Sequence, residues 1–165
     1  MKIGYAAIIG AMMMAAIPAN AADLALNFGA LENRVLPGGE HFASYGYFGI
    51  SSPIETDFAV LIPGLSIEGS EELGSWGLVG TLVTSFGLGE NSAFDVVLTV
   101  IHDQPGFDGS KAVFLGGIGA GVSLFWGNWT ISPSLNVFQG LNIDDQLFTP
   151  LINFGYLLGA GDSAE

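Results

Sequence analysis

The sequence predicts an all-β protein, a closed antiparallel up-and-down β-barrel of about eight strands that crosses a membrane. Three observations predict this fold. Apolar residues alternate with small or polar ones along most of the chain. Hydrophobic residues make up 50% of the chain and its mean hydropathy is +0.53, yet no segment after the N-terminal leader approaches the roughly 18 apolar residues of a spanning helix. A closed barrel satisfies these conditions because every strand is paired and no backbone group is left unpaired in lipid.

The N-terminal leader has the order of a secretory signal peptide. Lys2 precedes an apolar run over 6–17, and small residues end the leader at Ala21 and Ala22. The apolar run is about a dozen residues, too short for the roughly 20 of a membrane anchor. We expect cleavage near Ala21 or Ala22. The expected organisation is a signal peptide over 1–22, a barrel over 23–160 and a short acidic C-terminal tail over 161–165.

Period-2 alternation places the strands. From 76 to 88, even positions are mostly large and apolar, whereas odd positions are mostly small. The same split recurs in four further segments and less cleanly in three early ones, where Pro63 requires an edge, a bulge or an unpaired position. The predicted strands are 24–31, 42–50, 58–67, 76–88, 94–100, 112–126, 129–137 and 148–158.

Charge indicates which face points outward. If the large apolar face were inside, the solvent face would be Gly, Ser, Thr, Val and Ala with almost no charge, unlike the charged outer faces of soluble sheets. Turning the large residues toward lipid removes this conflict. A soluble secreted β-sandwich or ligand-carrying barrel is the alternative.

Three polar residues are predicted to face the barrel interior: Asp95, Thr99 and Thr81. An eight-stranded barrel is just wide enough for side chains to fill, so small inward residues leave room for water but not for a wide pore. Because a buried carboxylate needs hydrogen-bond partners or a cation, we expect hydroxyls or water around Asp95.

The connections alternate between long and short, apart from 51–57, which is longer than expected. This order places both termini in the periplasm and nine of the 16 acidic residues on the outer rim, Glu32 and Glu40 among them. Divalent cations are candidate partners there, although no EF-hand spacing is present and a solvated, repulsive surface is the alternative. The candidate cation-binding residues are Glu68, Glu71, Glu72, Asp144 and Asp145.

Aromatic residues at strand ends predict interfacial girdles, with core packing as the alternative. Trp126 and Trp129 flank the tightest turn, and Trp76 and Phe148 lie at the other end of the barrel. Tyr156, in the last strand, is included in the same prediction.

The charge balance excludes nucleic-acid partners. The formal net charge is −13, and after leader removal the basic side chains are Arg34 and Lys111 alone. Such a surface repels phosphate backbones.

The last strand is the most specific feature of the sequence. Residues 153–160, reading Asn-Phe-Gly-Tyr-Leu-Leu-Gly-Ala, resemble the assembly signal of small eight-stranded outer-membrane barrel proteins, and the chain resembles that class over nearly its whole length. The resemblance implies a bacterial outer-membrane location after export through the inner membrane. It also implies outer-membrane lipid, lipopolysaccharide and the barrel-assembly machinery as partners.

No constellation predicts catalysis. His102 and Asp103, with Ser44 or Ser110 as a nucleophile, suggest a lipid-directed hydrolase or acyltransferase. However, adjacent strand residues point to opposite faces, and the same parity separates His41 from Ser44. We therefore predict no catalytic residues, no metal site, no cofactor and no enzyme activity. The predicted function is a structural or surface-interaction role; a narrow channel for small solutes or ions and a lipid-directed enzyme are the alternatives.

Overall fold

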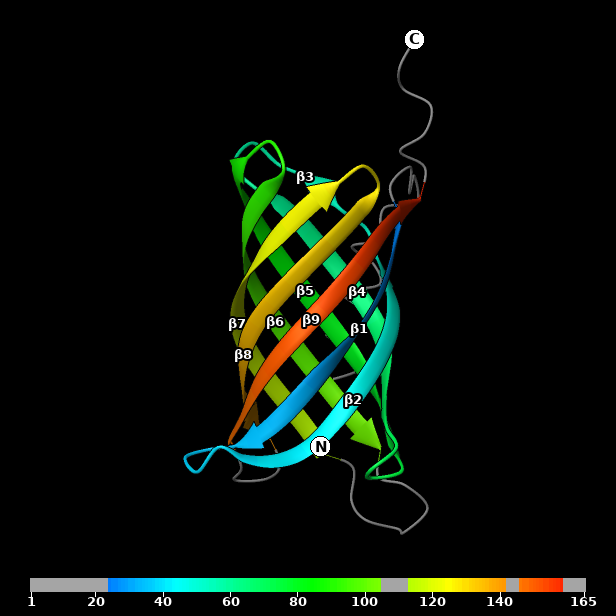
Figure 1. The fold of residues 1–165 in the computed structure, drawn as a ribbon, viewed down its shortest axis with the longest axis vertical. Helices are drawn as coiled ribbons and strands as arrows, with labels where there is room; N and C mark the ends of the chain where they lie inside the picture. Colours follow the sequence, from blue (N-terminus) through cyan, green and yellow to red (C-terminus); the bar gives the residue numbers. More distant parts are fainter. Residues whose placement is uncertain (1–23, 105–112, 142–145, 159–165) are drawn as a thin grey trace.

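The computed structural model describes residues 24–104, 113–141 and 146–158, which form one antiparallel sheet closed on itself. Each long strand pairs with the next long strand along the chain, β2 with β4 included, and β9 pairs with β1 to complete the circle (Figure 1). The predicted closed barrel is confirmed, with eight long strands and one two-residue strand. The described strands are β1 (Leu24–Val35), β2 (Glu40–Ser51), β3 (Ile54–Glu55), β4 (Val60–Ser70), β5 (Ser75–Gly89), β6 (Ser92–Gln104), β7 (Val113–Trp126), β8 (Trp129–Gly140) and β9 (Gln146–Leu158).

Several predicted features lie outside the described residues. They include the signal peptide over 1–22 and the tail over 161–165, together with Ser110, Lys111, Asp144 and Asp145. Within the part of the chain that the structure describes, no helix is long and apolar enough to cross a membrane.

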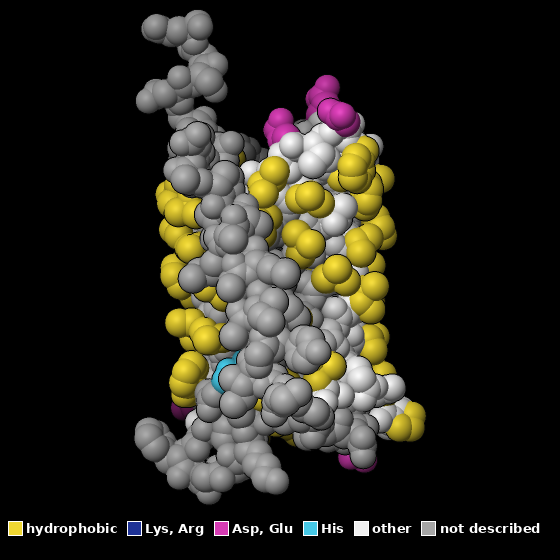
Figure 2. Space-filling view, turned by 180° about the vertical axis from the view of Figure 1, so that it is seen from behind, with side chains coloured by type: hydrophobic (Ala, Val, Ile, Leu, Met, Phe, Trp, Pro, Cys, Tyr) yellow, Lys and Arg dark blue, Asp and Glu magenta, His cyan; other side chains and the backbone are white. Residues whose placement is uncertain are grey.

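The wall of the barrel has its large apolar side chains outside, as the alternation predicts. In β5, Trp76 and Leu78 are exposed, whereas Val79 and Ser85 are buried. Hydrophobic side chains lie along the parts of the wall that are visible in Figure 2, and acidic side chains lie at the two ends. This distribution fits lipid around the wall and water at the rims.

The two ends of the barrel are distinguished by the turns and strand termini that lie there. We call the end with the turns at 36–39 and 71–74 the loop end, and the end where β1 begins and β9 finishes the terminus end (Figure 1). Gly39 and Gly74 close the loop-end turns at φ 68° and 58°, and Gly127 closes the β7–β8 turn at 58°. Glycine suits these positions because it has no Cβ to clash in the left-handed region.

The strands continue farther than the sequence pattern predicts. Glu32, Glu40 and Glu68 were expected in loops, but they lie within β1, β2 and β4. The prediction is wrong at these positions because backbone pairing continues to the turn, where Val35 faces Glu40. Both loop-end turns that the structure describes are therefore only four residues long.

The long gap after β2 contains the short strand β3, which pairs with the start of β4. Pro63 lies just beyond the end of the β2–β4 ladder at Ser51 and Gly64, and its carbonyl accepts a hydrogen bond from Ser52 N at 3.1 Å. Pro63 therefore lies where β2 no longer pairs with β4, so its lack of an N–H leaves no hydrogen bond of that ladder unmade. This is the unpaired position that the sequence predicts for this proline.

Candidate functional site in the barrel lumen

An apolar cluster, which we call the plug, packs inside the barrel near the loop end. Inward positions near the loop ends of β5 to β9 supply its buried core, and Val35 and Val113 pack against it. A second cluster of Leu31, Ala43 and Tyr45 lies on β1 and β2. Water gains no hydrogen bonds from such groups, so the plug disfavours hydration of the lumen near the loop end. The plug core is Val79, Ile101, Leu115, Phe138 and Leu147.

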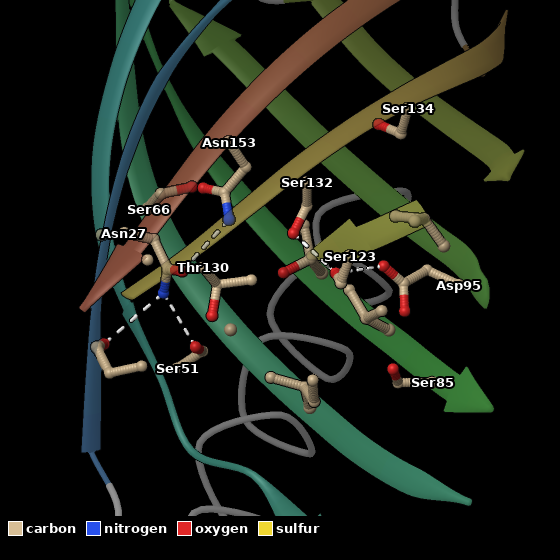
Figure 3. A pocket seen from close by; sticks show the side chains of 18 of the residues that line it. Asn27, Ser51, Ser66, Ser85, Asp95, Ser123, Thr130, Ser132, Ser134 and Asn153 are labelled. Atoms are coloured by element: carbon tan, nitrogen blue, oxygen red, sulfur yellow. Dashed lines mark hydrogen bonds between the residues drawn. The ribbon is translucent and has the colours of Figure 1, made fainter. Parts of the chain in front are cut away.

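A cavity of about 450 Å³ occupies the lumen beside the plug. Val79 and Phe138 line it where it meets the plug, and Gly127 and Asn128 line it at the terminus end. The cavity therefore runs from the plug to the turn between β7 and β8. Its polar side chains project inward from strands on opposite sides of the barrel (Figure 3).

One wall of the cavity is rich in amides. Asn27 Nδ2 donates to Ser51 Oγ at 2.8 Å, and Asn153 Nδ2 donates to Asn27 Oδ1 at 3.4 Å. Tyr47 OH donates to Asn153 Oδ1 at 2.9 Å. These bonds link β1, β2 and β9, so this wall is a connected polar network.

A second set of buried polar side chains joins β1, β8 and β9. Thr149 Oγ1 donates to Asn33 Oδ1 at 2.5 Å, with Thr149 fully buried. Asn136 Nδ2 donates to Ser134 Oγ at 3.1 Å and to the carbonyl of Thr149 at 3.4 Å. Asn33 Oδ1 and Asn136 Nδ2 are thereby paired, as buried polar atoms usually are.

The opposite wall carries a buried carboxylate. Asp95 of β6 is 4% exposed, and its Oδ2 accepts a hydrogen bond from Ser123 Oγ of β7 at 2.5 Å. Ser123 Oγ is also 2.6 Å from Ser132 Oγ of β8. Ser85 of β5 is the direct cross-strand neighbour of Asp95. Asp95 Oδ1 is buried and has no hydrogen-bond partner among the described residues.

The residues predicted for the interior all line this cavity. Asp95 and Thr99 are buried and Thr81 is half-buried. Sequence reasoning missed Asn27 and Ser51, because their strands alternate less cleanly than the later ones. The sequence did contain one indication: Asn27 and Ser51 are polar residues, and each lies an even number of positions from buried residues of its own strand, on the same face.

The three candidate cation-binding acids that the structure describes, Glu68, Glu71 and Glu72, do not gather into one site. Glu68 is buried and lines the cavity, whereas Glu71 and Glu72 are exposed in the loop-end turn. Within the described residues, no three His, Asp or Glu side chains are grouped so that they could hold a metal ion. Glu68 faces inward because β4 continues past the position where the sequence pattern predicts its end.

Charged side chains form a chain of contacts at the loop end of β1 and β2. Arg34 Nη2 lies 2.7 Å from Glu32 Oε1, and His41 Nδ1 lies 3.1 Å from the same oxygen. His41 Nε2 lies 3.1 Å from Glu72 Oε2, which also accepts from the Ser44 backbone N–H at 3.4 Å. The hydrogen bond from His41 lowers the pKa of Glu72, which lies in the turn outside the strands.

The proximity of His41 and Ser44 corrects the parity argument. The β1–β2 register passes from Asn33–Ala43 to Arg34–His41, so Phe42 is an extra residue in β2. This bulge shifts His41 toward the side of Ser44. Both ring nitrogens nevertheless face carboxylates, so the imidazole is not positioned to activate a serine hydroxyl.

The second histidine has a different setting. The His102 ring stacks on Phe114 with centroids 4.5 Å apart. Ser110, its candidate nucleophile, and the side chain of Asp103 lie outside what the structure describes. This stacking joins His102 to the neighbouring strand β7.

The aromatic residues lie near the ends of their strands. Trp76, Trp126 and Trp129 are 51%, 51% and 42% exposed, and Phe148 and Tyr156 are half-buried. The rings of Trp129 and Tyr156 meet edge to face with centroids 4.8 Å apart. Amphipathic indoles at these levels suit a membrane–water interface.

This combination of a closed sheet of eight long strands and an apolar outer wall is the architecture of small eight-stranded outer-membrane β-barrels. The N-terminal β-barrel domain of Pseudomonas aeruginosa OprF is similar in structure, with a TM-score of 0.55 and 20% identity, covering 80% of this chain and 97% of that one. Ail, the attachment invasion locus protein of Yersinia pestis, gives 0.51 and 15%, covering 82% and 98%. The outer membrane enzyme PagL gives 0.50 and 14%, covering 81% and 98%. No family model matches the chain, and no curated protein matches its sequence significantly.

Proposed function

We propose that this protein is a non-conducting structural barrel of the bacterial outer membrane, with its loop end at the cell surface and no enzymatic role. The plug carries the proposal. Five buried apolar side chains from five strands pack together near the loop end of the lumen, and a hydrophobic constriction of this kind opposes hydration and ion passage. The apolar wall and the exposed tryptophans support contact with outer-membrane lipid.

The orientation follows from the two ends. Both ends of the sheet, at Leu24 and Leu158, lie at the terminus end, where a chain exported and assembled from the periplasm leaves its termini. The loop end then presents Glu40, Glu71 and Glu72 to the outside. With four-residue turns on two connections, this rim suits a simple surface contact with lipopolysaccharide or its divalent cations better than an elaborate receptor.

Conductance in a planar bilayer tests this function. The folded protein is expected to produce no steady current. Phe138→Ser removes the largest plug side chain and is expected to raise conductance. This variant serves as the positive control, because its current shows that the measurement detects an open lumen. Folding of both proteins is checked first by the heat-dependent shift in gel mobility in SDS. Steady ohmic current through the unaltered barrel would contradict the proposal and favour a narrow channel.

A further inference from the structure

We propose that the cavity is a binding site for a small primary ammonium ion, with Asp95 as the charged partner. The main observation is that the two carboxylate oxygens of Asp95 differ in their hydrogen bonding. Oδ2 accepts from Ser123, whereas Oδ1 is buried and has no hydrogen-bond partner among the described residues. An isolated buried carboxylate oxygen is costly unless a cation or donor compensates it. A bound ammonium group supplies both the charge and the missing donor.

The serines beside Asp95 are arranged to accept further hydrogen bonds. Ser123 has one hydroxyl hydrogen, and it is donated to Asp95. The hydrogen of the Ser123–Ser132 bond must therefore come from Ser132. Ser132 Oγ keeps its lone pairs for a donor in the cavity, and Ser85 lies directly across from Asp95 on the neighbouring strand. An ammonium group has three N–H donors, which match one carboxylate oxygen and two hydroxyl oxygens.

The chemistry of this wall favours an amine over a metal ion. Ca²⁺ takes six to eight oxygen ligands and usually more than one carboxylate, whereas no cluster of three potential ligands occurs among the described residues. A bare monovalent ion would occupy only a small part of a cavity of about 450 Å³, since even a water molecule takes about 30 Å³. The space and the apolar surface of the plug leave room for a short hydrocarbon chain.

The cavity also supplies a route for such a ligand. It reaches Gly127 and Asn128 at the terminus end, and plug residues line its other part. A ligand therefore enters and leaves at the terminus end without crossing the membrane. This inference goes beyond the structural role, because a closed barrel without a ligand would satisfy that role equally well.

Isothermal titration calorimetry with n-propylammonium tests the proposal on the detergent-solubilised, folded mature protein. Two probes serve as controls: n-propanol lacks the charge, and trimethylpropylammonium has the charge but no N–H donors. Only n-propylammonium is expected to bind. Asp95→Asn is expected to weaken its affinity about ten-fold or more, since hydrogen bonds to charged groups are the stronger class. Ser132→Ala is expected to weaken binding less.

Glu71→Gln is the control for net charge, because Glu71 is exposed in the loop-end turn and does not line the cavity. It is expected to leave affinity nearly unchanged. Equal losses in Asp95→Asn and Glu71→Gln would show a general attraction of cations to an acidic protein and would overturn the site. Binding of n-propanol or trimethylpropylammonium with similar affinity, displacement by equimolar Na⁺, or no binding of n-propylammonium would also overturn it. The heat-dependent gel shift excludes variants that do not fold.

Discussion

His41 Nε2 lies 3.1 Å from Glu72 Oε2 and joins β2 to the turn after β4, beyond the point where the two strands cease to pair. The β2–β4 ladder ends at Gly46 and Gly69, so the loop-end half of β2 has no strand partner on that side. Glu72 takes the place of that partner by accepting the Ser44 backbone N–H. Side chains therefore take the place of backbone pairing at this junction between β2 and the turn after β4, which we call the seam.

This seam is expected to respond to pH. The pKa of Glu72 is lowered by its hydrogen bond to His41, so its contribution is present above the unfolded pKa and is lost as pH falls through the folded one. At higher pH a neutral His41 donates from only one ring nitrogen and cannot serve both Glu32 and Glu72. Hydrogen-exchange protection of the Ser44 amide, corrected for intrinsic rate, should therefore peak between these two titrations.

His41→Ala should abolish the high-pH limb of that profile and lower Ser44 protection at its maximum. Glu40 and Glu71 also lie in this region, so Glu71→Gln is the control for a change of rim charge. Ser44 protection that stays constant with pH in the unaltered protein would show that the seam does not depend on this contact.

Replacing Thr149 tests the buried polar group between β1 and β9. Thr149→Val keeps the shape but removes the donor to Asn33 Oδ1, a buried atom that would then be unsatisfied. We expect a loss of about 1–3 kcal/mol in the free energy of unfolding. Thr149→Ser retains the hydroxyl and should lose less. Urea unfolding in lipid vesicles, followed by fluorescence, compares them; equal stability of Thr149→Val and the unaltered protein would contradict the role of this bond.

Close approach of strands explains one glycine of β7. A Cβ at Gly121 would lie 2.6 Å from the Pro133 carbonyl oxygen and 2.7 Å from Ser134 Cβ, and backbone atoms cannot move aside cheaply. Gly121→Ala is expected to cost about 1–3 kcal/mol. Gly46 in β2 has open space around the same position, so Gly46→Ala is the matched control. The same unfolding assay measures both, and a cost at Gly46 equal to that at Gly121 would argue against crowding as the cause.

The alternation of residues was sufficient to predict the barrel and the direction of its faces. In β5 to β9 almost every outward position is apolar and many inward positions are small, and a one-residue slip would reverse every side chain. The interior placement of polar residues follows from the same parity. This information is local to each strand, which explains why a single sequence carries it.

The plug could not be predicted in the same way. Ile101, Phe138 and Leu147 lie just outside the predicted strands, which ended at 100 and 137 and began again at 148. Their inward direction depends on pairing that continues beyond the clean alternation, as it does between Ile101 and Leu115. The bulge at Phe42 is likewise a property of two strands together. Neither the plug nor the bulge produces a repeating residue pattern within the sequence of a single strand.

The position of the tryptophans predicts how deeply the barrel lies in a bilayer. Trp76 is the second residue of β5 at the loop end, whereas Trp126 and Trp129 flank the turn at the terminus end. Single-tryptophan proteins, with the other two replaced by Phe, should each be quenched more by lipids brominated near the glycerol backbone than by lipids brominated near the chain ends. Interfacial indoles give this order because their N–H groups remain near water. Stronger quenching of Trp126 and Trp129 by chain-end bromines would place the terminus end inside the bilayer, and the apolar band would then have to be redrawn toward Trp76.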